Sequence, residues 1–409
     1  MENQKPSSFN RRKFLTNTAK VVGVGAAGYI YFSGRDNEVT SVETPPMNKH
    51  VFLTKPYLFT ISHNRMSVRC ITNKLSYTWV EYGLDAAKLD QKALLVTDGL
   101  VHAYERIHEI HLEELKEGTQ YYYRVVAKEV LRFEQEDTIT YGETIYSDVY
   151  SFSTMHENAE EVSWLVLNDI HDSPTSFPQL LDLNKNNPYD YVFLNGDMFN
   201  YQSGEEQIIE HLIKPCTDVF ASQKPMLFVR GNHEMRGKFA HQLKDYFTYP
   251  QRQFYHYQFG SVFTIVLDTG EEEIETGFDK SDAYREMQAK WLENIMQSKE
   301  YQTATFKVVH MHIPPFYSFD QKGSRHCKKV FAPLFNRYKV DLVIAGHTHT
   351  FGVHPPAKEQ HDYPIVIGGG PIPGNRTLIK VKANKQLLEL QMLKDDGSVV
   401  GEYKIKAVR

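Results

Sequence analysis

The chain has 409 residues, which is longer than one typical domain, and we expect two or three domains with a sizeable buried core. Hydrophobic residues make up 41% of the chain and charged residues 24%, an ordinary globular composition that excludes a disordered, collagen-like or polytopic membrane protein. The formal net charge is −5, from 46 Lys and Arg against 51 Asp and Glu, so there is no basic field for a nucleic-acid polymer, and a small-molecule partner is favoured.

The first 46 residues are typical of an export signal followed by a polar linker. The adjacent Arg11 and Arg12 precede an uncharged, Gly- and Ala-rich run at 21–32, the layout of a basic region and a short apolar region. This layout resembles the twin-arginine signal, which implies that the twin-arginine export machinery carries the folded protein to the bacterial periplasm. The run is shorter than the roughly 20 residues of a spanning helix. Because no clear Ala-x-Ala site follows it, the alternative is an uncleaved segment that tethers the protein to the membrane.

Residues 47–155 are expected to form an all-β sandwich. Runs rich in β-branched and aromatic residues, separated by turn residues, lie at 67–72, 77–82, 121–127 and 149–154. Tyr121 follows a turn at Gly118 and predicts a tyrosine corner, in which the phenol bonds back to upstream backbone. The stretch is similar to a fibronectin type III-like domain, and we expect it to have a structural role, at a wall of the active cleft or at a dimer contact.

From residue 163 onward, five apolar runs each end in polar residues that are able to bind a ligand. Strands buried on both faces are almost continuously apolar, and ligand sites of layered α/β folds gather at strand ends. Helical stretches lie between the runs, at 205–214 and 282–299, and the alternating tail at 377–408 is expected to complete a sheet. The sequence therefore predicts a β-rich layered core flanked by helices. The runs and the residues after them are 164–167 with Asp169 and His171, 191–194 with Asp197, 226–229 with Asn232 and His233, 306–309 with His310 and His312, and 342–345 with His347 and His349.

The side chains at these strand ends are Asp, Asn and His, a donor set that suits Fe, Mn or Zn. The chain has 18 His, whereas its three cysteines, Cys70, Cys216 and Cys327, are odd in number and widely spaced, which excludes a disulfide framework or a thiolate metal site. Any one of these motifs alone is weak, since a lone His is more often structural than a ligand. Taken together, the set is able to hold two metal ions.

Five motifs follow one another in order: Asp169-x-His171, Gly196-Asp197, Gly231-Asn232-His233-Glu234, Val309-x-x-His312 and Gly346-His347-x-His349. Together they resemble the calcineurin-like metallophosphoesterase superfamily, of which purple acid phosphatases are members. The resemblance covers about residues 160 to 375, and the sandwich ahead of it extends it towards the purple acid phosphatase arrangement. It implies a four-layer α/β catalytic domain over 156–409, with β-sheets flanked by helices.

The resemblance also implies a dinuclear centre in which Asp197 bridges two divalent ions, Mn, Fe or Zn. A carboxylate shared by two cations holds them about 3.5 to 4 Å apart, where a bridging water loses a proton near neutral pH and attacks phosphorus in line. The glycines before Asp197, Asn232 and His347 let the backbone turn sharply off each strand. The implied ligands are Asp169, His171 and His349 for the first ion and Asn232, His312 and His347 for the second.

His233 is, with Asp197, the implied catalytic residue. An imidazole titrates near working pH, and His233 would donate a hydrogen bond to a phosphate oxygen or a proton to the leaving alkoxide. Glu234 and Asp172 are interpreted either as orienters of the His ligands or as solvated surface carboxylates.

His310, Lys322 and His326 are weaker candidates for contact with the substrate. His310 lies two residues before His312 on one strand, so both face the same side, and His310 either supports the ligands or touches the substrate. Lys322 and His326 follow the fourth motif, in a loop that members of the superfamily use to line the substrate site.

One departure from the purple acid phosphatase pattern lies at Asn200. Those enzymes carry Gly-Asp-x-x-Tyr, whose phenolate binds ferric iron and gives the colour, whereas here Asn200 is third after Asp197 and Tyr201 arrives one place late. Exchange of the phenolate for the imidazole of His171 favours two divalent ions over a ferric centre. We therefore expect a colourless or weakly coloured enzyme.

These observations converge on an exported, dinuclear metal-dependent phosphohydrolase that cleaves a small phosphate ester, with a phosphomonoester as the leading substrate. The alternative within enzymes is a phosphodiesterase of cyclic nucleotides, nucleotides or lipid head groups, since Asp-x-His members of the superfamily include many diesterases. The alternative of another class is a non-catalytic periplasmic binding module with a vestigial metal site. The complete set of ligand types argues against the binding module.

Overall fold

The structure, a computed structural model, describes residues 49–135, 138–250, 252–272 and 280–407. The expected export signal with Arg11 and Arg12 lies outside the described residues. Residues His50–Arg409 form one compact unit. Among the helices within the described ranges, none combines the length and the apolar character that a membrane crossing requires.

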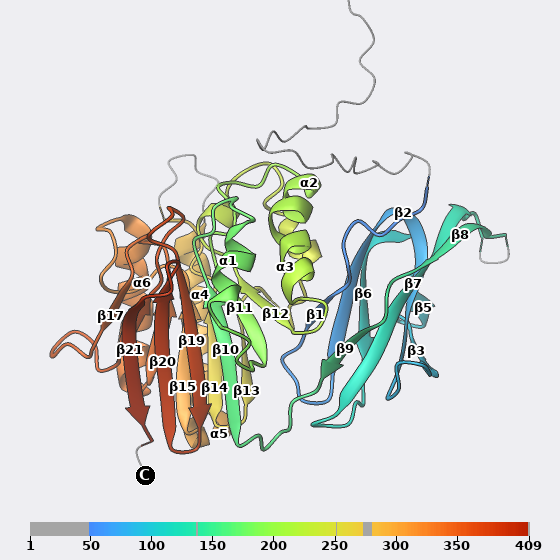
Figure 1. The fold of residues 1–409 in the computed structure, drawn as a ribbon. Coiled ribbons are helices and arrows are strands. Elements are labelled where there is room, and N and C mark those ends of the chain that lie inside the picture. The colour runs from blue at the N-terminus through green and yellow to red at the C-terminus, as the bar shows by residue number, and fades with distance from the viewer. Residues whose placement is uncertain (1–48, 136–137, 251, 273–279, 408–409) are drawn as a thin grey trace, which may run out of the picture. The chain divides into compact units, whose positions relative to one another are not determined.

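The described residues before 155 form an antiparallel sheet of seven strands and a small hairpin (Figure 1). The long strands β2 (Met66–Gly83) and β7 (Gln120–Arg132) pair with each other and carry the other strands at their edges. Alternate side chains of the sheet, such as Val68, Val80 and Tyr123, enter one core. The other strands are β1 (Tyr57–Phe59), β3 (Gln91–Ala93), β6 (Glu105–Leu112), β8 (Thr140–Tyr146) and β9 (Tyr150–Ser153), and the hairpin is β4 (Val96–Thr97) with β5 (Leu100–Val101).

Strand β2 changes partners along its length. Residues 66–71 pair with β6 and residues 76–83 with β7. The sequence predicts a turn between these two halves, but the strand continues through a bulge, where the hydroxyls of Thr72 and Ser76 both donate to the Lys74 carbonyl, at 2.7 and 2.9 Å. Because side chains from both halves share one core, the sheet folds back over itself. This sheet-rich region fits the expected sandwich, whose fibronectin type III-like identity stays a prediction.

The tyrosine corner predicted at Tyr121 is confirmed. The phenol oxygen of Tyr121 accepts a hydrogen bond from the backbone N–H of Lys116 at 2.9 Å. The ring itself stacks on Phe152 with centroids 5.7 Å apart. The corner thus fixes the entry of the chain into β7.

Two mixed sheets, each of six strands among the described residues, form the region after residue 160. The first has the order β12-β11-β10-β19-β20-β21 and the second the order β13-β14-β15-β16-β18-β17. In both sheets the central strands run parallel, so their carboxyl ends lie at one edge. The first sheet contains β10 (Glu161–Leu167), β11 (Tyr191–Asn195), β12 (Met226–Val229) and the predicted tail strands β19 (Thr377–Asn384), β20 (Leu387–Lys394) and β21 (Val399–Lys406). The second contains β13 (Tyr255–Phe259), β14 (Val262–Leu267), β15 (Phe306–Met311), β16 (Leu342–Ala345), β17 (Gly352–His354) and β18 (Ile365–Ile367).

Helices cover the outer faces of both sheets, which gives the layer order helix, sheet, sheet, helix. Leu165 and Leu194 pack under α1–α3, whereas the alternating Trp164 and Phe193 enter the core between the sheets. Helices α4 and α6 cover the second sheet, where Leu292 of α4 joins its outer core. The predicted helix-flanked layered core is therefore confirmed. The helical segments are α1 (Ser176–Asp182), α2 (Glu205–Ile208), a π-helical turn (Ile209–Ile213), α3 (Lys214–Val219), short 3-10 turns at His233–Met235 and Leu243–Tyr246, α4 (Ser281–Met296), α5 (Lys299–Thr303) and α6 (Lys322–Arg337).

Buried hydrogen bonds join the N-terminal sheet to the rest of the compact unit. The phenol of Tyr57 donates to the Tyr246 carbonyl, and the phenol of Tyr123 donates to the Ser222 carbonyl, both at 2.8 Å. Ile71 of β2 belongs to the same hydrophobic core as helices α1–α3. The predicted boundary near residue 155 thus separates two regions that share buried contacts, and their independence as domains stays a prediction.

Loss of one of these bonds is expected to destabilise the unit without changing the residues that carry out catalysis. Tyr123→Phe should lower the free energy of unfolding by about 1 kcal/mol, because the Ser222 carbonyl loses a buried donor. Urea denaturation measures this change, with Tyr122→Phe as the matched control, since Tyr122 is the neighbouring, less buried residue on the other face of β7. Equal midpoints for the two variants would show that the bond does not stabilise the unit.

Candidate metal centre

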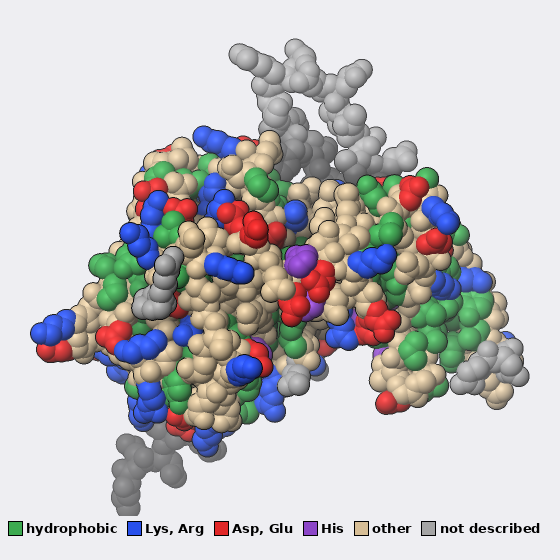
Figure 2. Space-filling view, turned by 90° about the horizontal axis from the view of Figure 1, so that it is seen from below, with side chains coloured by type: hydrophobic (Ala, Val, Ile, Leu, Met, Phe, Trp, Pro, Cys, Tyr) green, Lys and Arg blue, Asp and Glu red, His purple; other side chains and the backbone are tan. Residues whose placement is uncertain are grey.

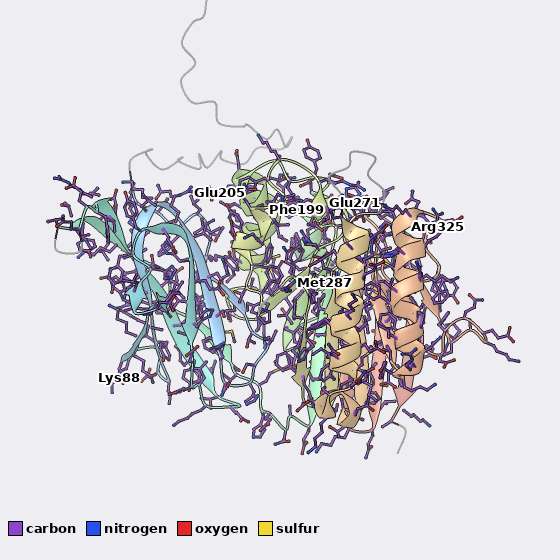
Figure 3. The ribbon with its side chains drawn as sticks, turned by 180° about the vertical axis from the view of Figure 1, so that it is seen from behind. Lys88, Phe199, Glu205, Glu271, Met287 and Arg325 are labelled. Atoms are coloured by element: carbon purple, nitrogen blue, oxygen red, sulfur yellow. The ribbon has the colours of Figure 1, made fainter. Side chains whose placement is uncertain are left out.

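The predicted ligands follow strands whose carboxyl ends meet at one edge of the two sheets. Figure 3 shows Phe199 and Glu271, which follow β11 and β14, at this same end. The structure brings every predicted ligand into contact with at least one other. They follow β10 (Asp169, His171), β11 (Asp197), β12 (Asn232), β15 (His312) and β16 (His347, His349).

Several of these ligands hold a strained backbone. An L-residue pays roughly 1–2 kcal/mol for the left-handed region, and such strain persists where the surroundings enforce it, often at functional sites. Gly231 shows how closely the strand ends approach, since a Cβ there would lie 2.1 Å from Asp197 Oδ1. The strained ligands have φ of 52° at Asp169, 46° at His171, 55° at Asp197, 74° at His347 and 57° at His349.

The first group of donors is Asp169, His171, Asp197 and His349, whose ligand atoms lie within 4.8 Å of one another. His171 Nε2 is 3.0 Å from His349 Nε2, and His349 Nε2 is 3.4 Å from Asp169 Oδ1. Ring nitrogens carry either a proton or a lone pair, so two nitrogens this close need a shared proton or a cation between them. The carboxylates and imidazoles of this group therefore fit a divalent metal ion.

The second group is Asp197, His312 and His347, also within 4.8 Å of one another. His312 Nε2 is 3.0 Å from Asp197 Oδ2, and His347 Nδ1 donates to Asn232 Oδ1 at 2.9 Å. The Nε2 of His347 is buried with no hydrogen-bond partner, which is costly unless the nitrogen binds something else. This group also fits a metal ion, and Asp197 belongs to both groups.

The charges of these donors also call for a cation. Burial disfavours an imidazolium, but the carboxylates of Asp197 and Asp169 outweigh burial and raise the pKa of His312 to about 10. Burial likewise disfavours the carboxylates, but the charge on His312 lowers the pKa of Asp197 to about 2 and also lowers that of Asp169. Burial and then His312 lower the pKa of His347 to about 4, which leaves its ring neutral and able to bind a metal. A bound cation would replace the proton on His312.

Asn200 orients His171, a predicted ligand, and stands at the position where the purple acid phosphatase pattern has tyrosine. The Nδ1–H of His171 donates to Asn200 Oδ1 at 3.1 Å, which directs the lone pair of Nε2 into the first group. The Asn200 amide is held in turn by Asp172, whose Oδ2 accepts its Nδ2–H at 2.9 Å. Asp172 therefore acts through Asn200, as the first of its two interpretations predicts.

Removal of this amide should weaken metal binding. Asn200→Ala deletes the acceptor of His171 and is expected to lower metal affinity about 10- to 100-fold, while alanine keeps the backbone carbonyl that holds His233. Competition with a metal-sensitive dye measures the affinity, with Tyr201→Phe as the control, since Tyr201 is 58% exposed. Unchanged affinity in Asn200→Ala would rule out the orienting role.

Glu234 braces the ends of two strands. It is fully buried, and its carboxylate accepts the backbone N–H groups of Gly231 at 2.6 Å and of Asp197 and Met198 at 2.8 Å. Burial and the negative charge of Asp197 raise the pKa of Glu234 to about 7. The interpretation of Glu234 as a solvated surface carboxylate is therefore wrong, and its role is to fix the loop that carries Asp197.

The ring of His233 lines a cavity of about 250 Å³ beside the donors. Its Nδ1–H donates to the Asn200 carbonyl at 2.7 Å, and its backbone N–H donates to Asp197 Oδ1 at 2.9 Å. Its Nε2 lies 4.0 Å from Asp197 Oδ2. Burial lowers the pKa of His233. His233 is thus adjacent to the donors without belonging to either group.

His310 lies in the core below the ligands. It is fully buried, its Nε2 accepts the indole N–H of Trp164 at 3.2 Å, and its ring stacks on Phe193 at 4.0 Å. Burial lowers the pKa of His310 to about 3. The prediction that it touches the substrate is wrong, because its ring is buried between Trp164 and Phe193 and does not line the cavity.

Lys322 and His326 point to another helix. Lys322 Nζ is 3.2 Å and His326 Nδ1 is 3.4 Å from the carboxylate of Asp282 at the start of α4, and neither residue lines the cavity. The sequence places both in a loop, but α6 begins at Lys322 and its first turn faces α4. The structure thus gives no support to the expected phosphate contact, which stays a prediction.

Four residues that the motifs do not contain line the cavity: Arg236, Glu272, Phe319 and Gln321. Glu272 Oε2 is buried without a hydrogen-bond partner, 3.7 Å from His347 Nε2. The ring of Phe319 meets His347 edge-on at 5.3 Å. Of these residues, Arg236 could have been suspected from the sequence to lie near the site, since it lies two residues after the third motif.

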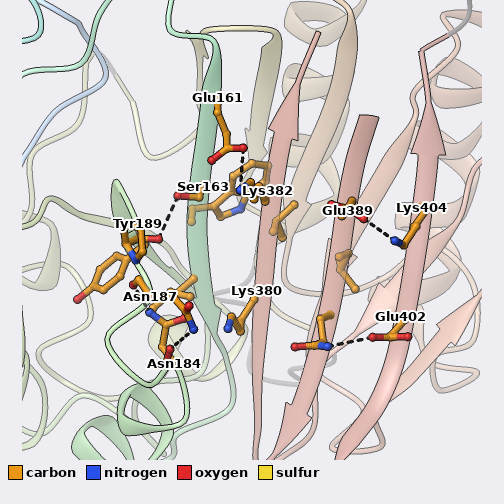
Figure 4. A pocket seen from close by; sticks show the side chains of 16 residues that line it. Glu161, Ser163, Asn184, Asn187, Tyr189, Lys380, Lys382, Glu389, Glu402 and Lys404 are labelled. Carbon is orange, nitrogen blue, oxygen red and sulfur yellow. Dashed lines mark hydrogen bonds and ion pairs between the residues drawn. The ribbon is translucent and has the colours of Figure 1, made fainter. Parts of the chain in front are cut away.

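A larger hollow of about 410 Å³ lies elsewhere, over β10 and β19–β21 (Figure 4). Four of its charged side chains form two ion pairs, Lys382–Glu161 at 2.7 Å and Lys404–Glu389 at 2.5 Å. Its lining contains no histidine or aspartate, so the chemistry belongs to the smaller cavity.

Comparison with known proteins finds similarity to a family over the residues that carry this site. Residues 163–351 match the calcineurin-like phosphoesterase family. Purple acid phosphatase 21 of Arabidopsis thaliana is 23% identical over 368 residues, covering 84% of this chain and 76% of the relative. Probable purple acid phosphatase 20 of the same plant is 22% identical over 364 residues, covering 81% of this chain and 78% of the relative.

Solved structures agree on the fold. Purple acid phosphatase PPD1 from yellow lupin (Lupinus luteus) seeds superposes with a TM-score of 0.63 at 18% identity, over 86% of this chain and 74% of that one. PhoD superposes with a TM-score of 0.58 at 11% identity, over 88% of this chain and 92% of that one. The matched family region contains all the predicted ligands.

Proposed function

We propose that this chain, a purple acid phosphatase-like metallophosphoesterase and phosphoric ester hydrolase, cleaves small phosphate esters at a centre of two divalent ions. The observation that carries the proposal is the buried carboxylate of Asp197, which belongs to both donor groups. One carboxylate between two cations holds them close enough to act on a single phosphate.

In this proposal the protein's own residues position the reactants and move one proton. The ions, when bound, supply Lewis-acid polarisation of a phosphoryl oxygen and activation of a water. His312 donates its Nδ1–H to the Asn195 carbonyl at 2.9 Å, which directs Nε2 to the centre. His233, held at Nδ1, presents Nε2 to the cavity, where its imidazolium form protonates the leaving oxygen.

We propose a phosphomonoester as the substrate class. The curated relatives are named as phosphatases, and the small cavity of about 250 Å³ suits a phosphoryl group with a modest leaving group. The formal net charge of −5 gives no overall basic field for a polyanionic polymer, so a small ester is favoured. Figure 2 draws the molecule from below, away from the strand ends that carry the donors, and there Lys and Arg side chains are intermixed with Asp and Glu.

For the metals we propose Mn, Fe(II) or Zn. Asn200 Oδ1 accepts from His171, and this amide stands where a tyrosinate would bind ferric iron in a coloured enzyme. Tyr201 is 58% exposed. Absorption spectra of the purified protein check this point, because a tyrosinate-to-iron charge-transfer band would contradict it.

We also propose export through the twin-arginine machinery, supported by Arg11 and Arg12 ahead of the uncharged run at 21–32. An uncleaved segment would leave the protein tethered at the periplasmic side of the membrane. Separately, the region 47–155 would serve as a fibronectin type III-like support, consistent with its buried contacts to the catalytic region. Fractionation of cells that express the wild type and Arg11→Lys/Arg12→Lys tests the export, which the double variant should block.

The experiment that tests the activity is a panel assay. The metal-free protein is supplied with Mn, Zn, Fe(II) or Mg and offered p-nitrophenyl phosphate and bis(p-nitrophenyl) phosphate. Turnover of the monoester that depends on metal is expected. Faster turnover of the diester would favour a phosphodiesterase, and no turnover of either ester would favour a binding module with a vestigial metal site.

A further inference from the structure

Arg236 is a cationic side chain beside the metal donors that the sequence motifs do not contain. It follows the 3-10 turn at His233–Met235 and lines the cavity together with Asp197 and His233. Its guanidinium forms a forked pair with Glu271: Nε donates to Oε2 at 2.9 Å and Nη2 donates to Oε1 at 2.7 Å. The carboxylate of Glu271 is fully buried.

The forked pair fixes the direction of the remaining guanidinium donors. A planar guanidinium has five N–H groups in a rigid arrangement, and Glu271 takes those on one edge. Nη1 lies on the other edge, 3.0 Å from His233 Nε2. Because Nδ1 of His233 is the donor to Asn200 O, Nε2 is an acceptor, and Nη1 donates towards the same point of the cavity that His233 faces.

Arg236 is also accessible from the cavity. Its side chain is 34% exposed, whereas its anchor Glu271 has no exposure. A ligand that reaches His233 Nε2 and Asp197 therefore meets Nη1, and an oxyanion there would take over the hydrogen bond that His233 now accepts. Arginine is well suited to this because its fork matches the oxygens of a phosphate.

We propose that Arg236 is a specificity-determining residue that binds a non-bridging phosphoryl oxygen and favours phosphomonoesters over diesters. The inference rests on the proposed phosphatase function and deepens it. A bound monoester carries a second negative charge that a diester lacks, and the diester's second substituent must occupy a position near one of the oxygens. A hydrogen bond from a charged donor to that extra charge discriminates between the two esters.

The test compares wild type with Arg236→Ala and Arg236→Lys after both variants are loaded with metal. In Arg236→Ala, the KM for p-nitrophenyl phosphate and the Ki for inorganic phosphate should each rise about tenfold or more, while kcat/KM for bis(p-nitrophenyl) phosphate changes less than about threefold. Arg236→Lys keeps the positive charge but loses the forked geometry, so its KM and Ki values should lie between those of wild type and Arg236→Ala. Arg337→Ala is the matched control, because Arg337 also pairs with a glutamate, Glu293 at 2.9 Å, but is 62% exposed at the end of α6.

Two further readouts separate the inference from structural damage and from the proposed function. Bound metal should match wild type in all variants. Arg236→Ala leaves the buried Glu271 carboxylate without its ion-pair partner and should lower the melting temperature, so all kinetics are measured well below that temperature. Glu271→Gln, which keeps Arg236 but loosens its fork, should repeat the monoester-selective loss in weaker form. An equal loss on both esters, or an unchanged Ki for phosphate, would overturn the role of Arg236. If wild type cleaves neither ester, the proposed function fails, and calorimetric binding of inorganic phosphate to wild type and Arg236→Ala still decides whether Arg236 binds phosphate.

Discussion

Asp197→Asn is expected to abolish hydrolysis and to remove at least one of the two bound ions per chain. Asp197 is the donor that both groups share, and it also accepts the backbone N–H of His233 at 2.9 Å. The amide keeps the shape of the side chain but loses the charge that balances the cations. We expect kcat/KM to fall by at least about a thousandfold, comparable to the loss of a principal electrostatic group in an active site.

Elemental analysis of dialysed protein and steady-state kinetics measure these two effects in parallel. Asp190→Asn is the matched control, because Asp190 precedes the same strand at its opposite end and accepts the backbone N–H of Ser163 at 2.7 Å. The control should keep both ions and near wild-type activity. Retention of two ions and of activity in Asp197→Asn would contradict the bridging role.

His233→Gln is expected to lower kcat while leaving the metal content unchanged. The side chain faces the cavity without belonging to either donor group, and general acid catalysis contributes about 10²–10⁴-fold. The loss should be large for an alkyl ester such as glycerol 2-phosphate, whose leaving alkoxide needs a proton. It should be smaller for p-nitrophenyl phosphate, whose leaving phenolate is stable.

This dependence on the leaving group distinguishes proton donation from a merely structural role. His256→Gln provides the control, since His256 stacks on Phe263 at the edge strand β13, with centroids 5.2 Å apart. Equal losses on both esters would favour a role for His233 in binding phosphate rather than in protonating the leaving oxygen. Loss of metal from His233→Gln would instead make it a ligand.

The sequence indicates which side chains gather at the site because these residues obey a simple geometric rule, whereas their assignment as ligands of two ions comes from the family resemblance and stays a prediction. Each follows a short apolar run, and parallel strands bring their carboxyl ends to one edge. Asp197 and Asn232, which are 35 positions apart in the chain, therefore end beside each other and near His347. The layered fold was predictable for the same reason, since alternating and continuous apolar patterns separate half-buried strands from buried ones.

Two kinds of residue could not be predicted in this way: those that meet because loops fold together, and those whose role depends on how deeply they are buried. Arg236 and Glu271 meet because two separate loops fold together, and no periodic pattern encodes that approach. The two-residue spacing of His310 and His312 indicates that both side chains face the same side of the strand. It does not indicate which of the two lies beyond the strand end, at the site. His310 consequently fills the core under Trp164.

The account depends most on two ions acting together at Asp197. Metal-free protein titrated with Mn or Zn, with bound metal and p-nitrophenyl phosphate hydrolysis measured at each step, tests this claim most directly. We expect hydrolysis to stay low at one ion per chain and to saturate as the second ion binds. Full activity at one ion per chain, or activity in the metal-free protein, would contradict it.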